Sequence, residues 1–331
     1  MLLAYPVLEA VCVMSRYVLG IDTSFDDTAL SLYDPVDHLV VDSVLSSQTH
    51  QHVSWQGVVP HWASYYHLRT IDKLYNQLLY VNNITLQDIG LICCTSHPGL
   101  ASCLVIGLTF ARTLSILHNI PLQEVNHIHG HLISPLLEHS NIYPNITLSI
   151  AGGHSDFYLV DSPVTYHLIG QCLDDACGEC FDKTARILGL GMYGKYVEQS
   201  ASQYSPVNAK SLVMPRVKTK NLDLSFSGLK TAFSRFWSIN KDSISQEHAA
   251  FLMQASITKH LTDKVKVAFR RYRSIKNLCL VGGVACNKYV RQTIGALCKK
   301  SGIRFIVPSN RYCVDNASMI CLAGYSSKTS G

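Results

Sequence analysis

The chain has 331 residues, of which 47% are hydrophobic and only 15% are charged. This composition allows an extensive core and excludes wholesale disorder, and the length is sufficient for two packed domains but not three. The formal net charge of +5 is mild, so it permits an anionic partner such as RNA without requiring one.

The cysteines are numerous, twelve in all, and some lie inside apolar runs, such as Cys93 and Cys94. This usage is typical of a reducing compartment, where cysteine serves as a small hydrophobic residue. Cys177 and Cys180 form a CxxC with no second pair nearby, which favours two buried side chains over a zinc ribbon.

The first thirteen residues are apolar, contain Glu9 and have no basic stretch before the apolar run. We therefore interpret residues 1–13 as an N-terminal extension and not as a secretory signal. Two origins stay open: an extension upstream of a start at Met14, or a remnant of an organelle-targeting segment. No stretch reaches the roughly 20 uncharged apolar residues that span a bilayer, so no membrane partner is expected.

The first predicted elements form a strand, a turn rich in Asp, Ser and Thr, and a second strand over residues 17–33. A helix is then predicted near 67–79, a strand at 89–95 and a helix at 102–117. The alternation of strands and helices indicates an α/β fold.

The second half opens with the same design, because residues 147–160 read as strand, Gly-Gly turn and strand. Helices near 174–188 and 246–272 and a strand at 277–281 follow, and the irregular segment 191–223 is predicted as a loop over a cleft. Two halves that each begin with a hairpin indicate a duplicated fold with the cleft between them.

The segment VNHIHGH places His127 and His131 four residues apart, so both imidazoles can project from one face of a helix toward a single ion. This spacing also arises by chance, and a pair on a helix surface is the alternative. The metalloprotease motif needs Glu directly after the first His, where Ile128 stands, so peptidase chemistry is disfavoured.

Two glycine pairs predict a nucleotide clamp. Gly152-Gly153 lies in the second hairpin, and Gly282-Gly283 ends a buried strand and leads into a helix that carries Asn287. Glycines allow close approach to the backbone, and a helix N-terminus favours phosphate. An ordinary strand-to-helix turn is the alternative for either pair alone.

Charged residues gather in LDDACGECFDKTARILGL, which we interpret as one helix. A solvated face accounts for most of them, namely Asp174, Asp175, Glu179 and Lys183. Asp182 lies beside the apolar face and is predicted to reach into the cleft and bind a ribose hydroxyl.

A basic amphipathic helix is predicted at 263–276, and Arg216, Lys218 and Lys220 add positive charge in the preceding loop. Basic residues interleaved with aromatic ones are typical of contacts to a phosphate backbone. A solvated helix face is the alternative.

Together these segments resemble the tRNA N6-adenosine threonylcarbamoyltransferase family, in the bacterial and mitochondrial branch once described as glycoproteases. The resemblance runs over nearly the whole chain, and its blocks follow in one order: LGIDTSFDDTA, GVVPHWAS, TSHPGL, VNHIHGH, IAGGHSDFYLV, LDDACGECFDKTARILGL, SFSGLKTA, GGVACN and CVDNASMI.

The resemblance implies two related α/β domains of the actin-like and sugar-kinase-like superfold, with a nucleotide- and metal-binding cleft between them. We expect the domains at 14–140 and 141–310, and a C-terminal segment, 311–331, that packs back on the first domain. It also implies that Asp315 joins the two histidines on one Fe²⁺ or Zn²⁺ ion per subunit.

Asp27 stands where the family usually has an acidic residue, and our hypothesis is that it orients or deprotonates the amine that attacks in the implied reaction. The nucleotide contacts that the resemblance implies are Ser149, Ile150, Ala151, Gly152, Gly153, Asp182, Lys195 and Asn287.

The implied reaction transfers the threonylcarbamoyl group from L-threonylcarbamoyl-AMP to N6 of adenosine 37, just 3′ of the anticodon, in tRNAs that read ANN codons. AMP is released. The implied partners are the tRNA and either a second copy of the chain or accessory tRNA-modification proteins. The bacterial cytoplasm is the expected compartment, with the mitochondrial matrix as the alternative.

The chain departs from the family pattern at four positions. Lys195 stands where a glycine of the nucleotide loop is usual, and His97 and Gln56 also replace glycines. Tyr65 replaces a usual Arg. These changes bear on nucleotide affinity and on how tRNA docks.

Two other functions are compatible with the superfold. A phosphotransferase needs a catalytic acid and Mg²⁺ but no His-x-x-x-His. A catalytically silent nucleotide-binding scaffold is expected to lose the histidines that this chain keeps, and only the altered loop around Lys195 favours it.

Overall fold

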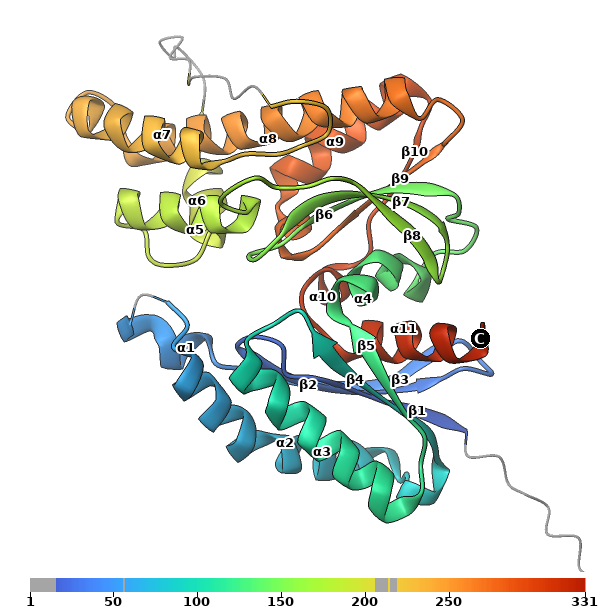
Figure 1. Cartoon of the computed structure of the whole chain (residues 1–331). Coiled ribbons are helices and arrows are strands. Elements are labelled where there is room, and N and C mark those ends of the chain that lie inside the picture. The colour runs from blue at the N-terminus through green and yellow to red at the C-terminus, as the bar shows by residue number, and fades with distance from the viewer. Residues whose placement is uncertain (1–15, 56, 206–213, 215–218, 331) are drawn as a thin grey trace, which may run out of the picture.

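In the computed structural model, the described residues are 16–55, 57–205, 214 and 219–330. The predicted extension at 1–13 and the residues Met14, Gln56, Arg216 and Lys218 lie outside them. The chain forms two α/β domains, one in the lower part and one in the upper part of Figure 1.

The first sheet pairs its strands in the order β3-β2-β1-β4-β5. Its first three strands are antiparallel neighbours, whereas β4 and β5 run parallel to β1. The strands are β1 (Tyr17–Asp22), β2 (Asp27–Asp34), β3 (Leu39–Ser47), β4 (Ile89–His97) and β5 (Leu122–Asn126).

The second sheet has the order β10-β9-β6-β7-β8, which repeats the first order in reverse listing. Again a hairpin pair is antiparallel and two later strands join in parallel. The strands are β6 (Asn145–Ile150), β7 (Ser155–Ser162), β8 (Thr165–Gly170), β9 (Asn277–Val281) and β10 (Arg304–Ile306). The two sheets confirm the predicted duplication.

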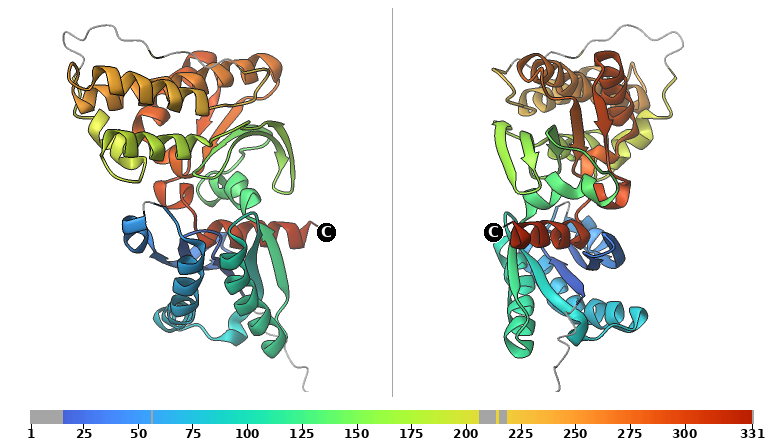
Figure 2. Two further views of the ribbon diagram at one scale, coloured as in Figure 1. Left: turned by 60° about the vertical axis from the view of Figure 1, so that its left-hand side comes forward. Right: turned by 90° about the vertical axis from the view of Figure 1, so that its right-hand side faces the viewer.

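Helices cover both sheets and fill the space between them (Figures 1 and 2). The α-helices are α1 (Thr49–His52), α2 (Pro60–Asn82), α3 (Ala101–His118), α4 (His127–Ile133), α5 (Cys177–Leu188), α6 (Lys195–Ala201), α7 (Ser227–Asn240), α8 (Gln246–Arg271), α9 (Lys288–Ser301), α10 (Asn310–Cys313) and α11 (Ala317–Thr329). The 3-10 helices are η1 (Val53–Trp55), η2 (Leu86–Asp88), η3 (Ser134–Leu137) and η4 (Gly283–Cys286).

The last helix of the chain lies on the first domain. α11 packs on β1, β2, β4 and β5 on one side and on α4 on the other. Its approach to the sheet is so close that a Cβ at Gly20 would collide with Ala317 and Cys321 of α11. Because β1 carries glycine there, the residue just before α11, Asn316, and its neighbour Asp315 are held against the first domain.

Three local predictions were wrong. Asp174 and Asp175 precede α5 and so do not lie on that helix; Asp174 accepts hydrogen bonds from Phe226 N and Ser227 Oγ, and Asp175 pairs with Lys183 and Lys230. The segment 191–223 contains the helix α6. Asn287 is the N-cap of α9 and does not lie within the helix.

Cys177 and Cys180 are free and fully buried in the core of the second domain, which agrees with the packing interpretation of the CxxC. Both lie on the face of α5 that also buries Phe181 and Leu188.

α3 is long and apolar enough to cross a membrane by length and composition alone. The helix nevertheless packs on β4 and beside α2 as one layer of the first domain. Its buried face consists of small and branched residues, including Cys103, Leu104 and Ala111. α3 is therefore a covering helix of the sheet in this structure.

Candidate metal centre and nucleotide cleft

The two candidate metal histidines lie on α4, directly after β5. The side chain of Asn126 caps this helix by accepting hydrogen bonds from the backbone N–H of Ile128 at 2.8 Å and of His129 at 3.2 Å. An Asn that ends a strand and caps the next helix fixes where the helix begins. His127 is thereby the first residue of the helix, and His131 follows one turn later.

The structure brings the three residues of the predicted metal site together. One ligand atom from each of His127, His131 and Asp315 lies within 4.8 Å of the others. The imidazoles are 4.8 Å apart between ring centroids and nearly perpendicular. His127 is 7% exposed and His131 fully buried, so the alternative of a pair on the helix surface is wrong.

The distances fit a single metal ion. Asp315 Oδ1 lies 3.4 Å from His127 Nε2 and 3.1 Å from His131 Nε2. Ligand atoms about 2.0–2.1 Å from one tetrahedral ion lie about 3.3 Å from each other. The donor set of two imidazoles and one carboxylate is typical of Zn²⁺ and Fe²⁺ sites with open coordination positions.

The histidines and carboxylates of the site shift one another's pKa values. Burial by itself lowers the pKa of His127, but the carboxylates of Asp315 and Asp22 outweigh it, so the pKa lies well above its ordinary value. Burial raises the pKa of Asp315, and the two histidines more than reverse that shift. A cation is thus favoured between these side chains, whether it is a proton or a metal ion.

His129, between the two candidate ligands, points elsewhere. Its Nε2 lies 2.6 Å from the carbonyl oxygen of Pro163, and its ring stacks on Tyr166 with centroids 5.2 Å apart. The three histidines of VNHIHGH therefore divide between the metal centre and the contact with the second domain, as the 3.6-residue period of a helix requires.

Asp27 begins β2, near Asp22 and Asp315. One of its carboxylate oxygens is buried without a hydrogen-bond partner among the described residues. Burial, supported by the nearby Asp315 and Asp22, raises its pKa to about 6. A carboxylate with a pKa near neutrality can accept a proton during a reaction at physiological pH.

The turn between β6 and β7 is open on one side. The space around a Cβ at Gly152 or Gly153 is empty, so a ligand can approach the backbone there. On the other side Gly282, at φ +89°, leaves room for Ile150, whose backbone a Cβ would strike. The two predicted glycine pairs thus meet at one place, which supports the clamp interpretation.

Ser149 lies on β6 just before this turn. It is fully buried, and its hydroxyl shares a hydrogen bond of 2.7 Å with His154 Nε2. The ring of His154 lies 5.8 Å from that of His131. Ser149 and His154 therefore connect the glycine turn to the metal centre.

Asp182 and Lys195 belong to the second domain, on α5 and at the start of α6. Asp182 Oδ1 accepts a hydrogen bond of 2.6 Å from the backbone N–H of Gly194, and burial raises the pKa of Asp182 to about 6. Lys195 Nζ lies over the rings of Tyr193 and Tyr196, at 5.6 and 5.4 Å from their centroids. The Tyr193 hydroxyl donates to the Thr49 carbonyl at 3.3 Å, so this loop touches the first domain.

The side chain of Asn287 is engaged inside the second domain. Its Oδ1 accepts from Val290 N at 3.0 Å, and its Nδ2 donates to Gln254 Oε1 at 2.9 Å. These bonds fix the start of α9, so the structure does not present this amide as a free nucleotide contact.

Sequence reasoning did not identify three residues of the site: Asp22, Asp26 and His154. Burial, followed by the charges of Asp27 and Asp315, raises the pKa of Asp26 to about 7. The adjacent acids of FDD were a signal for Asp26, because two neighbouring carboxylates beside a strand end are costly without a role. Asp22 and His154 left no such pattern.

The sequence matches known proteins of one family over nearly its whole length. The family model described as tRNA N6-adenosine threonylcarbamoyltransferase matches residues 39–322. A protein of that name from Francisella philomiragia is 39% identical over 313 residues, which are 93% of each chain. Another from Maridesulfovibrio salexigens is 37% identical over 331 aligned positions, covering 95% of this chain and 92% of the relative.

Solved structures share the fold at low identity. Full-length HypF in its phosphate- and nucleotide-bound form is 13% identical with a TM-score of 0.63, covering 95% of this chain and 56% of that one. Component A of the Acidaminococcus fermentans (R)-2-hydroxyglutaryl-CoA dehydratase is 15% identical with a TM-score of 0.55, covering 95% of this chain and all of the other.

These likenesses confirm the predicted actin-like fold of two related domains. The sequence matches extend over nearly the whole chain on both sides of the comparison. The chain therefore belongs to the tRNA N6-adenosine threonylcarbamoyltransferase family and is a transferase that modifies tRNA.

Proposed function

We propose that the chain transfers the threonylcarbamoyl group from L-threonylcarbamoyl-AMP to N6 of adenosine 37 in tRNAs that read ANN codons. The observation that carries this proposal is the cluster of His127, His131 and Asp315 within 4.8 Å, connected through His154 to an open glycine turn. A charged centre beside a backbone cradle fits an acyl group activated by an adenylate.

The metal ligands in this proposal are His127 Nε2, His131 Nε2 and one oxygen of Asp315. Fe²⁺ and Zn²⁺ both suit this donor set. A divalent ion bound there supplies positive charge at the reacting centre. Metal analysis of protein purified without added metal, followed by reconstitution with each ion, distinguishes the two.

Asp27 is the proposed proton acceptor. The N6 amine attacks the carbamoyl carbon, a C–N bond forms, and the bond from that carbon to the phosphate oxygen breaks so that AMP leaves. The amine loses one proton in this exchange. A carboxylate whose pKa burial raises to about 6 is basic enough to accept it.

The adenylate is proposed to lie along the turn from Ile150 to Gly153, with Asp182 toward its ribose. The open space at Gly152 and Gly153 supports backbone contact with the phosphate. Lys195 begins α6 directly after Gly194, whose backbone N–H donates to Asp182, and its ammonium group contacts two aromatic rings. It is therefore placed to modulate nucleotide affinity without being a principal contact.

Purified protein supplied with threonylcarbamoyl-AMP and unmodified tRNA tests this function. We expect the modified nucleoside in the tRNA, measured by mass spectrometry, together with stoichiometric AMP. ATP turnover with a small-molecule acceptor and no modified nucleoside would support the phosphotransferase, and nucleotide binding with no turnover would support the scaffold.

The tRNA contact is proposed to include the basic end of α8. Arg270 and Arg271 are exposed there, whereas Lys264 is buried and donates to the carbonyls of Thr219 and Asn221 at 2.9 and 2.8 Å. The exposed arginines can therefore meet a phosphate backbone, whereas Lys264 cannot. Figure 1 shows α8 on the outer side of the second sheet, so such a contact lies away from the metal centre.

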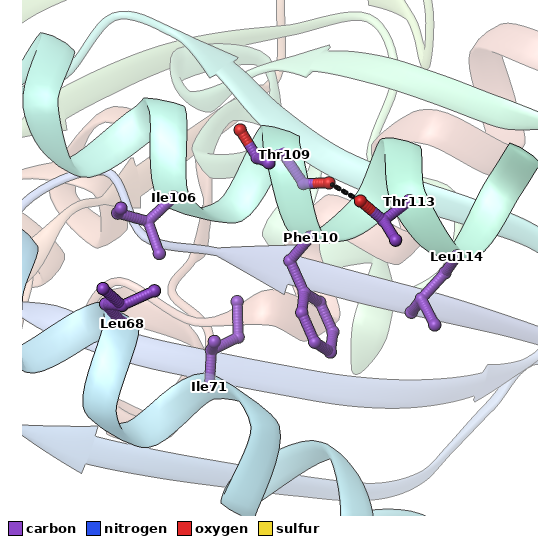
Figure 3. Close-up of a pocket in the computed structure, with 7 residues that line it drawn as sticks. All are labelled: Leu68, Ile71, Ile106, Thr109, Phe110, Thr113 and Leu114. Carbon is purple, nitrogen blue, oxygen red and sulfur yellow. Dashed lines mark hydrogen bonds between the residues drawn. The ribbon is translucent and has the colours of Figure 1, made fainter.

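A protein partner is proposed to dock on the helical face of the first domain. Side chains of α2 and α3 line an apolar groove of about 270 Å³, shown in Figure 3: Leu68, Ile71, Ile106, Thr109, Phe110, Thr113 and Leu114. Exposed Val105, Ile116 and Leu117 extend the apolar surface of α3. The proposal rests on this exposed apolar surface, which a docked protein would cover. Sedimentation velocity of the purified chain distinguishes a homodimer from a monomer that needs an accessory protein.

The curated relatives compared above are bacterial, which supports the bacterial cytoplasm as the place of action. Nothing among these relatives favours the mitochondrial matrix. Fractionation of cells that express the tagged chain tests this location.

A further inference from the structure

A buried carboxylate lies behind the metal centre. Asp22 is the last residue of β1 and is only 1% exposed. Its strand is held on both sides, by β2 and by β4, and its Oδ1 accepts a hydrogen bond of 3.1 Å from the backbone N–H of Ser24. The backbone therefore fixes the carboxylate, and its second oxygen is left for another partner.

That second oxygen faces a metal ligand. Asp22 Oδ2 lies 3.5 Å from His127 Nδ1, while His127 Nε2 faces Asp315 on the opposite edge of the ring. His127 Nδ1 is buried and has no hydrogen-bond partner among the described residues. The two carboxylates thus lie at the two nitrogens of one imidazole.

The position of Asp22 matches what a metal-binding imidazole needs at its second nitrogen. A neutral imidazole that offers the lone pair of Nε2 to a metal carries its proton on Nδ1. A buried Nδ1–H needs an acceptor, and a carboxylate in that position fixes both the tautomer and the orientation of the ring. Asp22 supplies the oxygen nearest to that requirement.

We infer that Asp22 is a positioning residue that holds His127 in the tautomer and orientation needed to bind the metal. This inference rests on the proposed metal site. Asp22 lies behind the imidazole and not at the open side of the centre, so it acts through His127 and does not touch substrate.

The test uses Zn²⁺ alone as the probe, with the full chain and a competing chromophoric chelator. We expect Asp22→Asn to weaken zinc binding by about 10- to 100-fold, because an amide cannot accept the Nδ1 proton with the strength of a carboxylate. In ¹⁵N-histidine spectra of the zinc-loaded protein, the Nδ1 proton of His127 is expected downfield in the wild type and shifted upfield in Asp22→Asn.

Asp34 offers a matched control, because it is an equally buried carboxylate at the other end of the same sheet, 3% exposed and bonded to Val36 N at 2.9 Å. Asp34→Asn is expected to leave zinc affinity unchanged. Equal losses in both variants would show a general effect of removing a buried charge and would overturn the inference.

The outcomes separate this inference from the proposed function. If the wild type binds no zinc, the metal site itself is wrong. If the wild type binds zinc and Asp22→Asn binds it equally well with the same His127 tautomer, only the role of Asp22 is wrong. Should Asp22→Asn fail to fold, Asp22→Glu decides, since it displaces the carboxylate by one methylene: weaker zinc binding supports the inference and unchanged binding overturns it.

Discussion

The carboxylate of Asp182 accepts a 2.6 Å hydrogen bond from the backbone N–H of Gly194 and so anchors the residue that precedes α6. The side chain predicted to bind a ribose hydroxyl therefore also holds the loop that leads into Lys195 and α6. One carboxylate has two oxygens, so anchoring the loop leaves the other oxygen for the nucleotide.

Replacement of Asp182 is expected to reduce nucleotide affinity. Asp182→Ala should weaken AMP binding about 10- to 150-fold, because a hydrogen bond to a charged group contributes about 1.5–3 kcal/mol. Asp182→Asn keeps an acceptor oxygen and should lose less. Isothermal titration of AMP measures both, and a wild-type affinity in Asp182→Ala would contradict the prediction.

Two substitutions separate the effect of the positive charge of Lys195 from the effect of its side-chain size. Its ammonium group contacts Tyr193 and Tyr196, so we expect Lys195→Met to change AMP affinity less than threefold, a difference below about 0.7 kcal/mol. A larger decrease would show that the charge meets the phosphate. A tighter complex in Lys195→Gly than in Lys195→Met would show that the side chain crowds the site.

Loss of one metal ligand should abolish both metal binding and tRNA modification. We expect the purified His127→Ala protein to contain far less than one metal ion per chain and to form no modified nucleoside. Its circular dichroism spectrum should still show a folded protein. Full modification activity in a metal-free His127→Ala protein would contradict the central proposal.

His129 provides the control on the same helix. His129→Ala removes the contact with the Pro163 carbonyl and the stacking on Tyr166, so we expect a stability loss of about 1–3 kcal/mol. Its metal content should stay at the wild-type level, because this ring does not face Asp315. Metal analysis and urea unfolding of the two variants together separate ligation from packing.

Stability should depend on pH through His260. Burial, followed by the charge of Lys264, lowers the pKa of His260 to about 4. Its Nε2 lies 3.4 Å from the backbone N–H of Ser225 and accepts from it only when unprotonated. The folded state therefore favours the neutral ring.

The direction of this pH dependence of stability follows from the protons that the unfolded chain binds. Between the unfolded pKa of about 6.5 and the folded value, the unfolded chain binds more protons, so stability falls as the pH decreases through this window. The decrease due to His260 is at most about 3 kcal/mol. Urea unfolding at pH 7 and pH 5, with a chelator present, should show a smaller difference in His260→Gln than in the wild type. The exposed His118→Gln should behave like the wild type.

Charge reversal at Arg270 and Arg271 should weaken tRNA binding and flatten its salt dependence. Each lost phosphate contact reduces the slope of log K against log salt by about 0.7–0.9. The same reversal at exposed Arg69 and Lys73 on α2 is the matched control. An unchanged slope would return the end of α8 to the alternative of a solvated face.

The fold could be predicted largely because its signals are local. Both hairpins combine apolar strands with polar or Gly-rich turns, and the long helices α3 and α8 have sustained helical patterning. α7 was missed because it is rich in Ser, Phe and Trp, which are weak helix formers, and it is stabilised by packing of Leu229 and Phe233 in the core.

The site could be predicted only in part from the residues themselves. The helical spacing of His127 and His131 is local, but Asp315 lies 184 residues after His131 and arrives through tertiary packing. No spacing rule connects such residues, so family resemblance was needed. Asp22 was missed for the same reason, because a strand end and a helix start meet only in the folded chain.

The packing of α11 on the first sheet also orders events during synthesis of the chain. The two histidines leave the ribosome long before the helix that positions the aspartate, and β1 stays uncovered on one face until that helix has emerged. The nascent first domain is therefore incomplete, and a polypeptide that stops before residue 311 lacks the third ligand. In the proposed metal site, binding of the ion by all three ligands therefore requires the segment that follows residue 310.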